Sequence, residues 1–131
     1  MQINQIKETC LYIKDLEKAK DFYHGKLGLS VITHVPDRLV FFRVGTSVLL
    51  CFNPEYSKDQ EIPPPHFAKG KQHIAFEVPV DDYADSKAEL EEKGITITYE
   101  HKWPNGKLSA YFEDLEGHVL EIVPSGLWDK T

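Results

Sequence analysis

The stretch YFEDLEGHVLEIVP, residues 111–124, reads as a strand, a tight turn and a returning strand. The returning strand, VLEIV, carries one carboxylate, Glu121, among four aliphatic residues. Because side chains alternate along a strand, Val119, Glu121 and Val123 share one face. A buried carboxylate is costly unless it is paired, neutralised or bound to a metal. From this strand alone, Glu121 is a half-exposed residue of an edge strand, a buried acid bonded to a neighbour, or a metal ligand.

The composition is that of an ordinary globular chain. Of the 131 residues, 41% are hydrophobic and 27% are charged. A chain of this length can bury one core without disulfides or a structural metal. The formal charge is -6 and basic residues are interspersed with acidic ones, which argues against nucleic acid or an anionic membrane as a partner. No apolar run could cross a bilayer and no leader-like segment opens the chain, so we expect a cytoplasmic protein. Cys10 and Cys51 lack CxxC spacing and are expected to be reduced and buried.

Both halves of the chain are predicted to follow the order strand, helix, strand, strand, strand. In the first half, Asp15 is the expected N-cap and Gly28 the end of the helix, with strands at 6–14, 29–35, 39–44 and 48–52. In the second half, Gly94 ends a helix over 82–93, with strands at 73–78, 95–100, 108–112 and 118–123.

Two offsets indicate that the second half repeats the first. Glu8 and His73, in the first strand of each half, are 65 residues apart, and Gly28 and Gly94 are 66 apart. Nearly equal offsets favour a duplicated module over a chance likeness. We therefore expect an α+β fold of two βαβββ modules, 1–53 and 73–131, which pair their sheets within a single domain over 1–131.

Residues 54–72 break this pattern, because they contain three consecutive prolines, a glycine and several charges. A segment of this length without secondary structure is unusual inside a compact domain. It is therefore either a mobile connector or a functional loop, and His66 and Phe67 are the residues that could give it a role.

A duplicated βαβββ unit in a chain of this length resembles the vicinal oxygen chelate superfamily, which includes glyoxalase I, fosfomycin-resistance thiol transferases, bleomycin-resistance proteins and extradiol dioxygenases. The matching text is ETCLYIKDLEKAKDFYHGKLGL in the first module, and QHIAFEV with YFEDLEGHVLEIVP in the second. The resemblance implies two sheets that form a cleft around a divalent metal, which is bound from the first and last strand of each module. It assigns Glu8, His73 and Glu121 as metal ligands. The fourth position falls near 49–51, where this chain has neither carboxylate nor imidazole.

The implied ligand set is two carboxylates and one imidazole, which suits Mn, Fe(II), Co, Ni or Zn. A substrate bound through two adjacent oxygens would have its developing negative charge stabilised by the metal. Glu8 and Glu121 are the candidate catalytic residues, with Glu8 able to act as a base as a ligand glutamate does in glyoxalase I. The expected substrate pocket is lined by Arg43, Phe52, Trp103, Ser109 and Tyr111. The histidines at 24, 34, 101 and 118 are expected at the surface.

The leading hypothesis is a metal-dependent isomerase, lyase or bond-cleaving enzyme of the glyoxalase-like group, acting on a small oxygenated molecule. The alternative is a non-catalytic ligand-sequestering protein of the bleomycin-resistance kind. A fosfomycin-type thiol transferase is disfavoured, because the only arginines are Arg38 and Arg43 and none lies near the C-terminus. The resemblance implies a homodimer, and it leaves open whether each site is built within one chain or shared by two.

Overall fold

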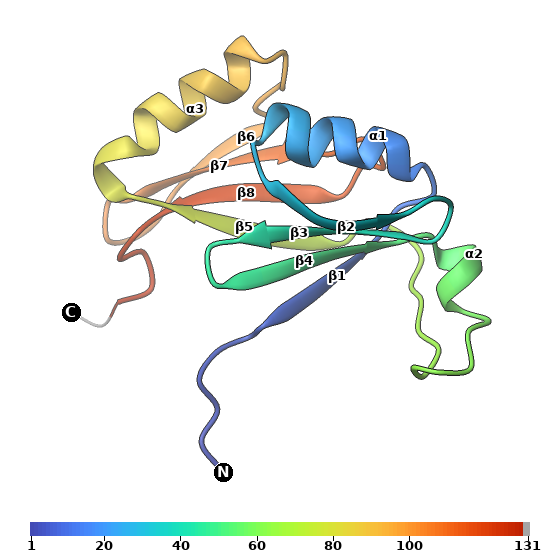
Figure 1. Cartoon of the computed structure of the whole chain (residues 1–131). Coiled ribbons are helices and arrows are strands. Elements are labelled where there is room, and N and C mark those ends of the chain that lie inside the picture. The colour runs from blue at the N-terminus through green and yellow to red at the C-terminus, as the bar shows by residue number, and fades with distance from the viewer. Residues whose placement is uncertain (130–131) are drawn as a thin grey trace. The chain divides into compact units, whose positions relative to one another are not determined.

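The computed structural model describes residues 1–129, and its internal contacts divide the chain into two units, Met1–Gly70 and a second that begins at Lys71. Each unit contains a four-stranded sheet and one main helix, in the order strand, helix and three strands (Figure 1). The predicted α+β class and the repeated βαβββ order are therefore confirmed. The last two residues of the predicted second module, 130 and 131, lie outside the described residues.

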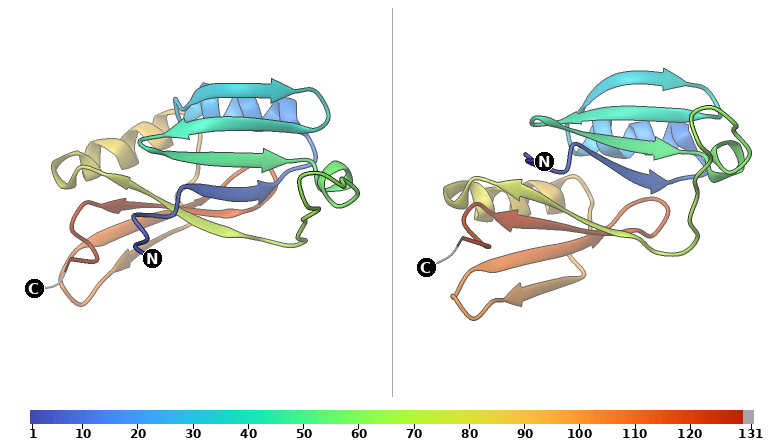
Figure 2. Two further views of the ribbon diagram at one scale, coloured as in Figure 1. Left: turned by 60° about the horizontal axis from the view of Figure 1, so that its bottom comes forward. Right: turned by 90° about the horizontal axis from the view of Figure 1, so that it is seen from below.

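The sheet of the first unit has the strand order β1-β4-β3-β2. Its strands are β1 (Glu8–Tyr12), β2 (Ser30–Val35), β3 (Leu39–Val44) and β4 (Ser47–Phe52). β1 pairs with β4 in parallel, and the other neighbours are antiparallel. The helix α1 (Leu16–Lys20) continues as the π-helical turn η1 (Asp21–Lys26) and lies across one face of this sheet (Figures 1 and 2).

The sequence explains why α1 forms where it does. The Asp15 carboxylate accepts a hydrogen bond from the Lys18 backbone N–H at 3.1 Å, as predicted for an N-cap. The apolar face is buried, and the ring of Tyr23 lies 5.6 Å from that of Phe42 on β3. Gly28 ends the helical segment with a φ of +77°, a conformation that L side chains rarely adopt.

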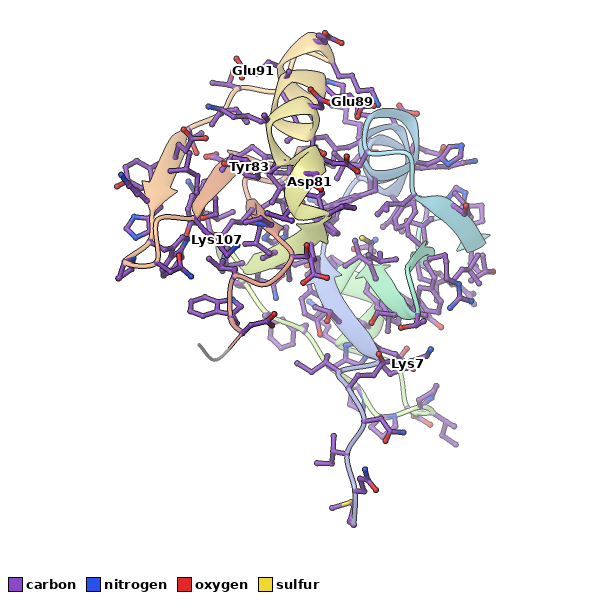
Figure 3. The ribbon with its side chains drawn as sticks, turned by 90° about the vertical axis from the view of Figure 1, so that its left-hand side faces the viewer. Lys7, Asp81, Tyr83, Glu89, Glu91 and Lys107 are labelled. Carbon is purple, nitrogen blue, oxygen red and sulfur yellow. The ribbon has the colours of Figure 1, made fainter. Side chains whose placement is uncertain are left out.

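The second unit repeats this arrangement with the strand order β5-β8-β7-β6. Its strands are β5 (His73–Val78), β6 (Tyr99–Lys102), β7 (Leu108–Glu113) and β8 (Val119–Pro124), and β5 pairs with β8 in parallel. The helix α3 (Tyr83–Glu92) follows the short turn η2 (Val80–Asp82) and crosses one face of the sheet. Tyr83, near one end of α3 in Figure 3, donates its hydroxyl to Glu100 at 2.9 Å, and Lys87 pairs with the same carboxylate at 3.1 Å.

The strands β4 and β8 lie inside their sheets, each with a neighbour on both sides. Burial on both faces explains why SVLLCF and VLEIVP are almost continuously apolar. Glu121 is therefore not on an edge strand, and only 4% of its surface is exposed. Of the three interpretations offered for Glu121 from the sequence, the half-exposed residue of an edge strand is therefore wrong.

Two further boundaries differ from those predicted. The connecting segment begins with the short helix α2 (Pro54–Ser57), which Asn53 caps by accepting from the Glu55 N–H at 3.1 Å. The strand expected at 95–100 is found at Tyr99–Lys102. Ile95 is buried and its N–H bonds to the Leu90 carbonyl at the end of α3, so strand pairing starts only after the chain has left the helix.

The remaining general expectations are met in part. Within residues 1–129 neither Cys10 nor Cys51 forms a disulfide, and Cys51 is buried while Cys10 is half-buried. No helix within residues 1–129 is long and apolar enough to cross a membrane.

Candidate functional site

The parallel pairing of β5 and β8 puts His73 and Glu121 on the same face of the second sheet. In this register Val119 lies opposite His73, and Glu121 lies opposite Ala75. The Nδ1–H of His73 donates to the Val119 carbonyl at 2.8 Å. The other ring nitrogen, Nε2, then faces Glu121 Oε1 at 3.3 Å. In the neutral ring this tautomer leaves a lone pair on Nε2, the state required of a metal ligand.

Glu121 is buried and only half satisfied. Its Oε1 faces His73, whereas its buried Oε2 has no hydrogen-bond partner among the described residues. A buried charged oxygen without a partner costs free energy, so a native structure that keeps one calls for an explanation. A cation at this point would contact Glu121 and the lone pair of His73 together. The donor set therefore fits a divalent metal.

Tyr111 lies directly opposite Glu121 on the neighbouring strand β7. Its ring stacks beside that of His73, with centroids 6.0 Å apart and planes at 22°. Burial, and then the negative charge of Glu121, raise the pKa of Tyr111. A hydrogen bond to Glu121 adds to this shift, so the phenol keeps its proton at neutral pH and directs it toward the Glu121 carboxylate.

Ser109 and Trp103 extend this face away from Glu121. Ser109 lies two residues before Tyr111 on β7 and is fully buried. The indole N–H of Trp103 donates to the Ser109 hydroxyl at 3.0 Å. Five predicted site residues are therefore brought to one face of the second sheet: His73, Trp103, Ser109, Tyr111 and Glu121.

The other three predicted residues lie in the first unit. Glu8 begins β1 opposite Val48, and Arg43 lies opposite Val48 from the other side, so Glu8 and Arg43 share a face. Both are exposed. Phe52 lies on the same face, is buried, and packs against the ring of Phe41 at 5.5 Å. Glu8 stands at the position that His73 occupies in the second unit.

The register also locates the fourth ligand position, which the sequence placed near 49–51. Glu121 lies opposite Ala75, two residues after His73, and Leu50 lies opposite Cys10, two residues after Glu8. Leu50 is apolar and 8% exposed. Within residues 1–129, no group of three or more His, Cys, Asp or Glu side chains is gathered so that it could hold a metal.

The connecting segment contributes one residue to the face that carries Glu8. Nδ1 of His66 lies 2.6 Å from the hydroxyl of Tyr12, and its ring meets Phe52 edge-on at 4.7 Å. Burial, and then the electrostatic effect of the nearby Cys10 thiol group, raise the pKa of Tyr12. Phe67, by contrast, is exposed. His66 is thus held on the first sheet.

His118 was expected at the surface, and this expectation is wrong because its side chain is 2% exposed. Its Nδ1 accepts a hydrogen bond from the Gln72 N–H at 3.0 Å. The Asp114 carboxylate accepts from the N–H groups of Glu116 and His118, both at 2.9 Å. The DLEGH segment therefore shapes its own turn and fixes the residue before His73. In the sequence, an Asp four residues before a His at a tight turn was the signal that could have indicated the burial of His118.

The remaining surface histidines follow the expectation only in part. His24 is exposed, whereas His34 and His101 are half-buried. His34 faces Glu17 at 3.4 Å, and His101 meets Trp103 edge-on at 4.6 Å.

A family model described as "Glyoxalase/Bleomycin resistance protein/Dioxygenase superfamily" matches residues 2–122, almost the whole chain. The chain belongs to this superfamily. Among solved structures, the superfamily member described as lactoylglutathione lyase from Agrobacterium tumefaciens is 34% identical, with a TM-score of 0.93 over 99% of this chain and 100% of that one. The fold and the resemblance inferred from the sequence are thereby confirmed.

Two curated relatives have other activities. Glutathione transferase FosA from Serratia marcescens is 28% identical over 92% of this chain and 80% of its own length. Metallothiol transferase FosB from Staphylococcus epidermidis is 27% identical over 98% of this chain and 88% of its own length. Superfamily membership is therefore established, while the named relatives include both a lyase and thiol transferases.

Proposed function

We propose that this chain is a divalent-metal-dependent enzyme that acts on a small oxygenated molecule, with His73, Glu121 and Glu8 as the metal ligands. The observation that supports the proposal is the contact between the exposed imidazole of His73 and the buried carboxylate of Glu121. One imidazole lone pair faces one carboxylate oxygen at 3.3 Å, while the second oxygen is buried without a partner. Glu8 occupies the strand position in the first unit that His73 occupies in the second, which supports Glu8 as the third ligand.

Three protein ligands leave coordination positions open for water or substrate. Two carboxylates and one imidazole are compatible with Mn, Fe(II), Co, Ni or Zn. The bound metal would supply Lewis-acid stabilisation of negative charge that develops on a substrate oxygen. Glu8 would come from the same chain or from a second copy in the homodimer that we expect.

The chain's own residues account for binding and proton transfer. Glu121 is buried, which makes its carboxylate a ligand that stays in place, whereas Glu8 is exposed and could exchange between ligand and base. Tyr111 keeps its proton and would donate a hydrogen bond to a substrate oxygen beside Glu121. Trp103 and Ser109 form the wall beyond it, and Arg43 and Phe52 would contribute from the face that carries Glu8.

Thiol transfer is the second candidate, favoured by the near full-length match to the two curated relatives. The chain has few groups for an anionic acceptor, since Arg38 is stacked on the Tyr56 ring at 5.0 Å and only Arg43 remains among the arginines. For this reason a phosphonate acceptor ranks below a neutral oxygenated substrate.

The test begins with metal-stripped protein and adds Mn(II), Ni(II) or Zn(II) in a thermal-shift experiment. We expect at least one ion to raise the midpoint by several degrees, because a ligand at about 100 times its Kd adds about 2.7 kcal/mol. Loaded protein is then assayed with methylglyoxal plus glutathione, by gain of thioester absorbance, and with fosfomycin plus glutathione, by loss of free thiol. Activity without any metal response would contradict the proposal. Tight binding of a ligand without turnover would instead favour a sequestering protein.

A further inference from the structure

A continuous row of aromatic rings runs along one face of the second sheet, from the His73–Glu121 pair to the C-terminal turn. Neighbouring ring centroids are 6.0, 6.1, 5.9, 4.6 and 4.9 Å apart. In order from the His73–Glu121 pair, the row consists of His73, Tyr111, Tyr99, His101, Trp103 and Trp128.

The backbone determines this alignment. Tyr99, His101 and Trp103 alternate along β6 and its continuation, so their side chains emerge on the same face. The register puts Tyr99 opposite Tyr111 and His101 opposite Ser109. The Asn105 amide donates to the Leu127 carbonyl at 3.3 Å, which ties the residue before Trp128 to the turn after Trp103. This turn also carries Lys107, labelled in Figure 3.

The row is unusually open for aromatic side chains. Tyr99 is 59% exposed and Trp128 is 72% exposed, although both touch other rings. Large adjacent aromatic groups that remain open to water mark binding surfaces in soluble proteins. The N–H of Trp103 is already bonded to Ser109, so the ring faces are what the row presents to a ligand.

We infer that this row binds a flat aromatic part of the substrate, whose oxygenated end reaches His73 and Glu121. The location of the oxygenated end rests on the proposed metal site, whereas the ring binding rests on the row alone. Rings stack in offset or edge-on arrangements at the spacings that the row offers. The row contains no Lys or Arg, so it suits an uncharged ring system better than a phosphate-like group. Its unbroken contact with His73 favours a ligand of the site over a second copy of the chain.

The two tryptophans of the sequence, Trp103 and Trp128, both belong to the row, so intrinsic fluorescence reports on it directly. The probes are 4-nitrocatechol, a flat ring with two adjacent oxygens that is used below its first pKa so that it is uncharged, and cyclohexane-1,2-diol, its aliphatic counterpart. With metal-free protein, we expect saturable quenching by 4-nitrocatechol, confirmed by calorimetry, and no response to the diol. Equal binding of both probes would overturn the inference.

The variants are Tyr99→Ser and Trp128→Ala, two exposed positions whose loss leaves the core intact. Each should weaken 4-nitrocatechol binding about 3- to 10-fold, measured by calorimetry. Phe67→Ala removes an equally exposed ring outside the row and should change nothing. Wild-type affinity in both row variants would overturn the inference. The inference would also be overturned if both row variants lost self-association in light scattering but kept their affinity for 4-nitrocatechol, because the row would then be an interface between copies.

Failure of the metal proposal and failure of the ring-binding inference give different results. If His73 and Glu121 bind no metal, 4-nitrocatechol still binds the row and Glu121→Gln leaves its affinity unchanged. If the metal site is real and the row is not, metal stabilises the protein normally and the row variants bind the probe like the wild type.

Discussion

Nε2 of His73 lies 3.3 Å from Oε1 of Glu121, across the parallel strands β5 and β8. The same register in the first unit places Glu8 and Leu50 at the corresponding positions. The duplicated module thus carries two candidate ligands in its second copy and one in its first. This asymmetry is the basis for proposing a site with three protein ligands and open coordination positions.

Replacing Glu121 should separate stability from metal binding. In metal-free protein, Glu121→Leu removes a buried carboxylate whose Oε2 has no partner. We expect the free energy of unfolding to rise by about 1 to 3 kcal/mol in urea titrations with a chelator present. The metal-induced stabilisation should disappear in the same variant. Glu77→Leu, at an exposed position of β5 on the same face, is the control and should have little effect. A clear loss of metal-free stability in Glu121→Leu would show that the carboxylate is satisfied.

His118 should act as a positioning residue for His73. His118→Ala leaves the Gln72 N–H without its acceptor, so the free energy of unfolding should fall by about 1 to 3 kcal/mol. Because Gln72 precedes His73, metal affinity should also fall, by about tenfold, in calorimetric titration. His118→Asn offers an amide oxygen as a new acceptor and should restore much of that affinity. A loss of stability with unchanged metal affinity would limit His118 to a structural role.

Stability should depend on pH through Tyr83 and Glu100. Burial, and then the hydrogen bond to Glu100, raise the pKa of Tyr83, so its contribution is complete below about pH 10 and is lost as the pH rises further. Hydrogen bonds from Lys87 and Tyr83 lower the pKa of Glu100, so its contribution holds above about pH 4.3 and is lost as the pH falls.

Urea titrations across the pH range check this expectation. Glu100→Gln should flatten the acid side of the stability profile, and Tyr83→Phe the alkaline side. Glu89→Gln is the control, since Glu89 pairs only at the surface of α3 with Lys93 at 3.0 Å (Figure 3). A Glu100→Gln profile parallel to that of the wild type would contradict the assignment.

The connecting segment should depend on His66 for its order. His66→Ala removes the hydrogen bond to Tyr12 and the edge contact with Phe52. We expect limited proteolysis to cut within residues 58–70 several times faster than in the wild type, because the open form of the segment becomes more populated. Phe67→Ala removes an exposed neighbour and should leave the rate unchanged. Equal cleavage rates in both variants would show that His66 does not hold the segment.

Sequence periodicity predicted the strands well because most alternate or are continuously apolar over their whole length. It placed β6 too early, since Ile95 looks like a strand residue but is buried at the end of α3. It missed α2, although Asn53-Pro54 is a recognisable helix start.

The candidate site was less predictable, because pairing across strands is not visible in one sequence. The repeat offset identified Glu8 and His73 as equivalent, but only the register showed that Leu50 corresponds to Glu121. The burial of His118 was missed, because its partner Gln72 is 46 residues away and the only local signal was the Asp114 carboxylate at the tight turn. The aromatic row likewise depends on contacts between β6, β7 and the C-terminal turn.

The most direct test of the metal site is elemental analysis of untagged protein purified without added metal. We expect about one equivalent of a first-row transition metal per chain for the wild type and for Glu77→Gln, and less than about a tenth for Glu121→Gln. Wild-type protein with less than about a tenth of an equivalent and no uptake of Mn, Ni or Zn, or full occupancy in Glu121→Gln, would contradict it.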